Sequence, residues 1–222
     1  ELNRLRKHYG LDEKNDFRKL YTDGDFNAYL DIPEFTKIEN LPKNHFFLGP
    51  VIWNATSTTH DTICKNKHNI YISMGSTGNN KLIDPIISSV LKTDFFIVIS
   101  GVLPAEKANL LKTHPKLNGR SAINSLLDPN SILPNCLLTI CHGGSGTVYQ
   151  SLSYGTPVLC FPTNPDQCLV SNAITTQNLG RCIQDQKPSQ KLIWDTIKNC
   201  LNNSLIKSNA KAYIEKIRDQ NT

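Results

Sequence analysis

The stretch Cys141–Gln167, CHGGSGTVYQSLSYGTPVLCFPTNPDQ, decides the fold class, because a loop, a helix and a strand follow one another within it. Its glycine- and hydroxyl-rich start comes directly after the apolar run 137–141. The segment 146–154 is typical of a helix and stops before Gly155, and the apolar run 157–162 is typical of a buried strand. This order predicts one unit of a parallel α/β sheet.

The same alternation extends in both directions along the chain. Further strands are expected at 69–74 and 94–100. Further helices are expected in the ranges 81–91, 104–113, 167–178, 189–203 and 204–219. Continuous apolar strands that alternate with helices indicate a parallel sheet covered on both faces. The sequence therefore predicts an α/β fold with a doubly wound parallel sheet over residues 69–222.

The residues before 69 follow a different pattern. The range 1–53 is irregular, with a helix that ends near Gly10 and two short strands punctuated by prolines. The range 54–68 is polar and rich in turn-forming residues, and we interpret it as a linker. The chain starts at Glu1 without an initiator Met, so we expect it to be a piece of a longer protein.

The composition argues against several classes of protein. The net charge of the 222-residue chain is +5, and its lysines and arginines are scattered, which disfavours a nucleic-acid partner. Apolar runs fall short of the roughly 20 residues that a membrane span needs, so we expect no stable membrane insertion. The seven cysteines form no CxxC pair, which favours reduced thiols and a cytoplasmic location.

The loop HGGSGT has the composition of a site for a phosphate or diphosphate. Its glycines let the backbone approach a ligand, and the N–H groups and dipole at the start of the following helix favour an anion. Ser145, Thr147 and His142 add side-chain donors. The loop MGSTGNN, with Gly75 and Ser76, occupies the same place after the strand 69–74. A ligand-free glycine turn is the alternative for either loop.

Other phosphate and catalytic motifs fit this loop less well. It has no lysine for a P-loop, and the dinucleotide fingerprint fails at Tyr149. A nucleophilic pair of Cys141 and His142 is disfavoured because adjacent strand residues point to opposite faces. A metal site that adds Cys160 lacks ligand spacing, so we expect no metal.

Asp166 and Gln167 stand at the start of the helix expected after the strand 157–162. A carboxylate beside an amide suits a polyhydroxylated ligand, because sugar hydroxyls both donate and accept hydrogen bonds. The alternative is an N-cap aspartate that only satisfies backbone N–H groups.

These motifs together resemble the UDP-glycosyltransferase family, especially its macrolide-type bacterial branch with the pattern HGGxGT…GxPxLxxP…DQ. YISMGS is similar to the first strand and Gly-Ser loop of the same domain, and NRLRKHYGL…PEF…LPKNHFFLGPV resembles the passage between the family's two domains. The resemblance implies the GT-B arrangement of two facing Rossmann-like domains. This chain then corresponds to the C-terminal, nucleotide-sugar-binding half with a tail of the N-terminal acceptor domain.

The resemblance also implies a role for each residue that matches the family pattern. Contacts to the donor diphosphate fall to His142, Gly144, Ser145, Gly146, Thr147, Gly75 and Ser76. Gln150, where the family often has Glu, corresponds to the ribose-binding position, and Asp166 and Gln167 to the sugar-binding pair. Asp128 and Pro129 depart from the family pattern in the stretch that helps to hold the base. The family's catalytic histidine lies in the acceptor domain, so no catalytic residue is expected in this chain.

The implied reaction is an inverting, metal- and cofactor-independent transfer of a hexosyl group from a UDP- or TDP-sugar to a hydroxyl of a small lipophilic or natural-product acceptor. Preorganised N–H donors and His142 would stabilise the leaving diphosphate. Two alternatives remain open from the sequence. One is a non-catalytic nucleotide-sugar-binding subunit of a split glycosyltransferase, and the other is a sugar-nucleotide epimerase of related fold.

Overall fold

The computed structural model describes residues 1–16, 20, 22, 24–52, 68–101, 103, 105–124 and 127–219. The strands are β1 (Asn27–Tyr29), β2 (His45–Phe47), β3 (Asn69–Ser73), β4 (Phe96–Ser100), β5 (Ser121–Asn124), β6 (Cys136–Cys141), β7 (Val158–Cys160) and β8 (Gly180–Cys182). The α-helices are α1 (Leu2–His8), α3 (Ile83–Val90), α4 (Ala105–Lys112), α5 (Pro129–Ile132), α6 (Ser145–Leu152), α7 (Pro165–Thr176), α8 (Gln190–Asn202) and α9 (Ser204–Arg218). Short 3₁₀ helices are η2 (Asn80–Leu82), η3 (Pro115–Leu117) and η4 (Leu133–Asn135).

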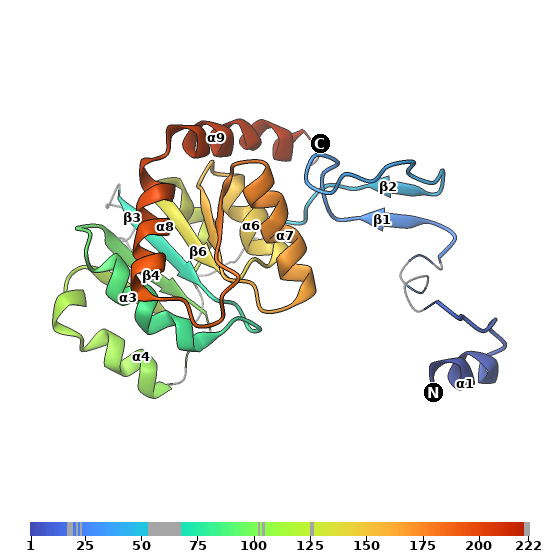
Figure 1. The fold of residues 1–222 in the computed structure, drawn as a ribbon, viewed down its shortest axis with the longest axis horizontal. Coiled ribbons are helices and arrows are strands. Elements are labelled where there is room, and N and C mark those ends of the chain that lie inside the picture. Colours follow the sequence, from blue (N-terminus) through green and yellow to red (C-terminus); the bar gives the residue numbers. More distant parts are fainter. Residues whose placement is uncertain are drawn as a thin grey trace.

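A six-stranded sheet in the order β5-β4-β3-β6-β7-β8 forms the centre of the molecule, and every pairing in it is parallel (Figure 1). The first strand of this sheet, β3, lies beside the fourth, β6, with Ser73 opposite Cys141 at their carboxyl ends. The strand order therefore reverses between β3 and β6, and in open parallel sheets this is where ligands bind. The predicted doubly wound parallel sheet is confirmed.

Helices cover both faces of the sheet, because alternate strand residues point to opposite sides. On one face, the strand residues Ile72 and Ile140 belong to a core that includes Ile86 of α3 and Ile197 of α8. The core of the other face joins strands β6 and β7 to α6, α7 and α9 through Cys141, Val158, Val148, Tyr149, Leu152, Ile174, Tyr213 and Ile217. Within the described residues, no helix combines the length and the apolar character needed to cross a membrane.

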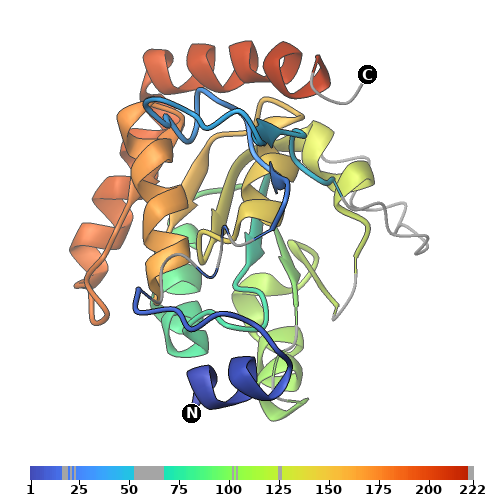
Figure 2. The ribbon, with the colours of Figure 1, turned by 90° about the vertical axis from the view of Figure 1, so that its right-hand side faces the viewer.

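The N-terminal part stands largely apart from this α/β body. Strands β1 and β2 form a separate parallel pair, and α1 lies away from the body in Figure 1, while Figure 2 views the molecule from the side on which this part projects, with the part in front of the body. It is attached through Ile32 and Phe35, which are buried against α6 and α9. The Ile32 N–H donates to the Tyr149 hydroxyl at 3.3 Å, and the Phe35 ring lies 5.1 Å from that of Tyr149 and 6.2 Å from that of Tyr213.

The elements differ from the expected ones mainly at their ends. The helix expected from residue 81 begins as the 3₁₀ turn η2, capped by the Asn79 side chain, and continues as α3. The short strands β5 and β8 were not expected from the sequence. Residues 54–67 of the predicted linker lie outside the described residues, and only His68 of that range is described.

Candidate functional site

His142 occupies the point where the sheet reverses its strand order. It directly follows β6, and its imidazole lies between the backbones of Gly75, from the loop after β3, and Gly144. A Cβ added at Gly75 would lie 2.5 Å from His142 Cε1, and one at Gly144 would lie 2.6 Å from Nε2. The two glycines are therefore required by the imidazole, and Gly75 also has a positive φ of 60°. The ring thereby packs the two strand-end loops together.

The N-terminus of α6 borders His142 and is open. Gly144 is its N-cap residue, and no side chain caps the helix. The next two residues, Ser145 and Gly146, are exposed, and Thr147 is half-buried. The α5, α7, α8 and α9 N-termini, by contrast, are capped by Asp128, Asn164, Ser189 and Asn203. The first-turn N–H groups of α6 and their positive dipole end are thus free for an anion.

The loop after β3 lies on the other side of the imidazole. Ser76 in this loop is exposed, next to Gly75. The helix start that follows is not open, because the Asn79 side chain accepts a hydrogen bond from the Lys81 N–H at 3.1 Å. Of the two helix N-termini expected at this edge of the sheet, only that of α6 is therefore uncapped.

The loop after β7 supplies Asp166 and Gln167, which the structure places differently. Asp166 is exposed in the first turn of α7, and it is not the N-cap, since Asn164 accepts from the Gln167 N–H at 3.0 Å. Gln167 is only 2% exposed. Its amide bonds to Thr163 and Thr77, two residues of the motif loops to which the sequence assigned no role in the site.

Burial lowers the pKa of His142 below its ordinary value, while the Ser73 backbone and the Asp166 carboxylate partly oppose that shift. Nδ1 is buried and makes no hydrogen bond within the described part of the chain. The Asp166 carboxylate, in the first turn of α7, thus favours the protonated form of the ring that follows β6. Binding of an anion at the open helix N-terminus would raise the pKa of the neutral imidazole beside it, because the negative charge stabilises the protonated ring.

Two further predicted positions lie near this edge of the sheet. Gln150 is on α6 and is 7% exposed. The departure from the family pattern at Asp128 and Pro129 has a structural explanation: Asp128 caps α5 by accepting from the Asn130 N–H at 3.1 Å, and Pro129 occupies the first turn.

The cysteines near the site are structural. Cys141 and Cys160 are fully buried and paired in register on β6 and β7, and the Gly143 N–H points to Cys141 Sγ at 3.3 Å. A hydrogen bond with Cys141, together with burial, raises the pKa of the Cys160 thiol. Cys136 and Cys168 are half-buried. Among the described residues, no three His, Cys, Asp or Glu side chains are grouped so as to hold a metal ion.

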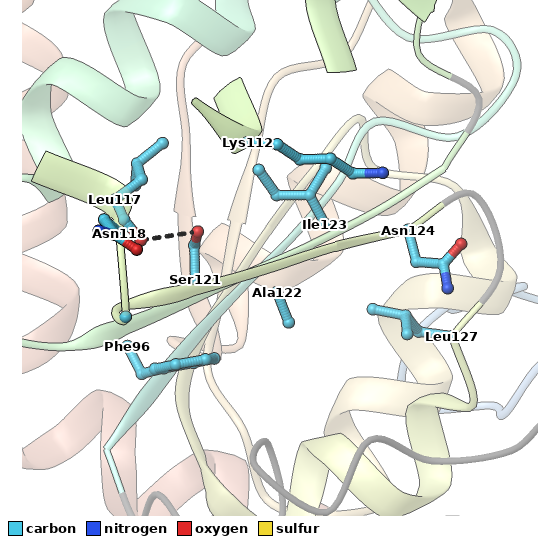
Figure 3. A pocket seen from close by; sticks show the side chains of 10 residues that line it. Phe96, Lys112, Leu117, Asn118, Ser121, Ala122, Ile123, Asn124 and Leu127 are labelled. Carbon is cyan, nitrogen blue, oxygen red and sulfur yellow. Dashed lines mark hydrogen bonds between the residues drawn. The ribbon is translucent and has the colours of Figure 1, made fainter. Parts of the chain in front are cut away.

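The hollow in Figure 3 lies elsewhere, along the outer strand β5. Its volume is about 320 Å³, and it contains none of the residues predicted to bind the diphosphate or the sugar. Ala122, Phe96 and Leu127 lie on one side of the strand and Ile123 and Lys112 on the other (Figure 3). The Ser121 hydroxyl is turned to the Leu117 carbonyl, to which it donates at 3.0 Å.

Comparison with known proteins identifies glycosyltransferases as relatives of this chain. A PGL/p-HBAD biosynthesis glycosyltransferase of Mycobacterium tuberculosis (strain ATCC 25177 / H37Ra) is 27% identical over 218 residues, 96% of this chain and 49% of its own length. A PGL/p-HBAD biosynthesis rhamnosyltransferase of Mycobacterium bovis (strain BCG / Pasteur 1173P2) is 26% identical over 190 residues, 84% of this chain and 41% of its own length. The chain thus spans about half the length of the relatives it matches.

The fold is shared with solved glycosyltransferases. The Spinosyn Rhamnosyltransferase SpnG complexed with thymidine diphosphate superposes with a TM-score of 0.75 at 18% identity, covering 98% of this chain and 57% of that one. The model of the glycosyltransferase family 28 C-terminal domain matches residues 69–221, which include β3 to β8 and the whole His142 site. Over this range, the chain belongs to the glycosyltransferase family 28 C-terminal domain family.

Proposed function

We propose that this chain is the donor-binding half of a glycosyltransferase that takes a hexosyl group from a TDP- or UDP-sugar. The observation that carries the proposal is the His142 imidazole, wedged between Gly75 and Gly144 beside the uncapped N-terminus of α6. The arrangement offers an anion a ring N–H, backbone N–H groups and a helix dipole at one place. The thymidine diphosphate named with the SpnG structure of the same fold supports a nucleoside diphosphate as that anion.

The roles of the other predicted site residues are assigned from the side chains and N–H groups that are exposed around His142. The Ser145 and Thr147 hydroxyls and the Gly146 N–H would bind the phosphates from the α6 side, and Ser76 would approach them from the loop after β3. The exposed Asp166 carboxylate would accept hydrogen bonds from hydroxyls of the sugar. Gln150 would contact the ribose from α6. Because the residue is 7% exposed, only the outer edge of its side chain is available for this contact.

In the proposed reaction, an acceptor hydroxyl oxygen bonds to the anomeric carbon as the bond from that carbon to the diphosphate breaks, which inverts the configuration. The acceptor's proton passes to a base outside this chain, on an N-terminal acceptor domain. The electron pair of the broken bond stays on the diphosphate, where His142 and the α6 N–H groups stabilise the growing charge. This step uses neither a metal nor a cofactor. The acceptor is a small lipophilic or natural-product compound with a hydroxyl group, as the family resemblance implies.

Calorimetric titration of the chain with UDP, TDP, ADP and NAD tests the proposal. We expect micromolar binding of UDP or TDP. We also expect His142→Ala to weaken it by about tenfold to more than a hundredfold, the effect of a charged hydrogen bond. His114→Ala, at the N-cap of η3 before the amino end of β5, is the control that removes an imidazole outside the proposed donor site. Equal binding by the His142→Ala and wild-type chains, or binding of none of the four, would contradict the proposal.

A further inference from the structure

We propose that Gln167 is a positioning residue that acts through Thr77 to hold the two loops on either side of the donor site at a fixed separation. The inference rests on the proposed function, because it concerns the same site. It differs from the role that the family resemblance gives to Gln167, a direct contact with the sugar. Thr77, Thr163 and Gln167 together are called the loop tie below.

The hydrogen bonds of the loop tie join segments that are far apart in sequence. Gln167 Nε2 donates to Thr77 Oγ1 at 3.0 Å. Gln167 Oε1 accepts from the Thr163 N–H at 2.7 Å and lies 2.9 Å from Thr163 Oγ1. The same Thr163 hydroxyl lies 3.1 Å from the Thr77 carbonyl oxygen. The loop after β3 is thus fastened to the loop after β7.

Burial separates Gln167 from a ligand-binding role. The residue is 2% exposed, whereas Asp166 beside it is exposed, as are Thr77 and Thr163. Oε1 accepts a hydrogen bond from the Thr163 N–H, and the Thr163 hydroxyl shares its single proton between Oε1 and the Thr77 carbonyl oxygen. A buried amide bonded in this way fixes structure, and removing one partner leaves a polar atom unsatisfied.

The loop tie bears directly on the diphosphate site. Thr77 follows Gly75 and Ser76, and Gly75 packs against the His142 ring with no room for even a Cβ. A shift of Thr77 therefore moves Ser76 and loosens the contact between Gly75 and His142. The tie also sets Ser76 relative to Asp166, so it should influence the affinity for a bare nucleoside diphosphate as well as for a nucleotide sugar.

A double-mutant cycle on the 222-residue chain tests this role. Thr77→Val removes the acceptor Oγ1 at an exposed position, and Gln167→Met removes the amide while keeping the length of the side chain. We expect each to weaken binding of the nucleoside diphosphate by about threefold to tenfold. Because both remove the same link, the double variant should be no weaker than the weaker single variant. Thr196→Val, which removes an exposed hydroxyl on α8, is the matched control with unchanged affinity.

Three results would overturn the proposal. The first is a Gln167→Met chain that binds the nucleotide sugar more weakly but the nucleoside diphosphate normally, which would make Gln167 a direct sugar ligand. The second is additive losses in the double variant. The third is wild-type affinity in Thr77→Val.

A ligand-free readout separates this proposal from the proposed function. The NMR signal of the His142 Cε1 proton, assigned by its loss in His142→Gln, should shift in Thr77→Val and in Gln167→Met but not in Thr196→Val. If the wild-type chain binds no nucleotide, the proposed function fails and this signal alone decides on the loop tie. An unshifted signal in both variants overturns it.

Discussion

At the scale of single residues, the site depends on glycines whose missing side chain makes room for one imidazole. Gly144 has an ordinary extended backbone, with φ −68° and ψ 135°, so only the contact of its absent Cβ with His142, at 2.6 Å from Nε2, excludes a side chain. Gly146, two residues later, has no heavy atom within 4 Å of such a Cβ. Of these two glycines in one motif, Gly144 is therefore required by packing against the imidazole, whereas Gly146 has space for a side chain.

This contrast predicts opposite effects of one substitution on stability. Gly144→Ala forces the imidazole out of place and should lower the free energy of unfolding by about 1–3 kcal/mol. Gly146→Ala, in the first turn of α6, should leave it unchanged or raise it by up to about 1 kcal/mol, because alanine favours the helix. Denaturant unfolding of both variants measures the difference. Equal destabilisation by the two would show that the imidazole does not set the requirement.

His142 also predicts how stability changes with pH. Its folded-state pKa is lowered, chiefly by burial, from the ordinary value of 6.5. On acidification the unfolded chain therefore takes up this proton first, and the folded state loses stability as the pH falls below about 6.5, down to the folded-state pKa.

Melting temperatures between pH 5 and pH 8 measure this contribution. We expect the melting temperature of the wild-type chain to fall more steeply on acidification than that of His142→Gln, which has no imidazole to protonate. Parallel curves for the two proteins would rule out the lowered pKa as the cause.

Much of the site at this scale was predictable from sequence, but its contacts were not. The motif around His142 identified the strand end, because glycines and hydroxyl-bearing residues directly after an apolar run are typical of the loop that follows a buried strand. That His142 packs against Gly75 depends on β3 and β6 being neighbours, which only the sheet order shows. Likewise, nothing local to Gln167 indicates that its amide is bound to Thr77, 90 residues away.

At the scale of helices and strands, burial decided what the sequence could predict. The four strands expected from apolar runs are all present as β3, β4, β6 and β7. The two edge strands were missed because β5 is half-buried or exposed throughout and β8 is buried only at Gly180, whereas β7, which also has three residues, is buried along its whole length. Edge strands are also half-solvated, so they lack the continuous apolar run that marks a central strand.

Helix caps allow a prediction at this scale. The Asn203 side chain accepts from both the Leu205 and Ile206 N–H groups and thereby starts α9 directly after α8. Asn203→Ala should lower the free energy of unfolding by about 1 kcal/mol. Asn202→Ala, one residue earlier at the end of α8, removes no cap and serves as the control. Thermal unfolding compares them, and the same melting temperature for both would contradict the assigned role of the cap.

At the scale of the whole molecule, the described residues divide into a well-packed α/β body and an N-terminal part with much apolar surface. Most of the large apolar side chains that are exposed precede residue 52, namely Leu2, Leu5, Tyr9, Leu11, Phe26, Leu30, Leu41, Phe46, Leu48 and Val51. Such a concentration is typical of a surface that packs against another partner. It supports the proposal of an N-terminal acceptor domain on this side of the chain.

The attachment between the two parts can be tested with two phenylalanines. Phe35 is 8% exposed between the rings of Tyr149 and Tyr213, so Phe35→Ala should lower the free energy of unfolding by about 3 kcal/mol. Phe26→Ala, at a residue 76% exposed, should change it by less than about 0.5 kcal/mol. Denaturant unfolding followed by tyrosine fluorescence distinguishes them. A small effect of Phe35→Ala would mean that residues 31–36 are not held to the body.

The docking of Ile32 and Phe35 has a consequence for synthesis on the ribosome. The chain is made from its N-terminus, and the hydrogen bond from Ile32 to Tyr149 spans 117 residues. Tyr213, which completes the aromatic cluster, is translated later still. Until these partners have emerged, the apolar side chains of Ile32 and Phe35 have nothing to pack against. Residues 31–36 therefore reach their final place only after the helices that bury them have been made, although they are translated before them.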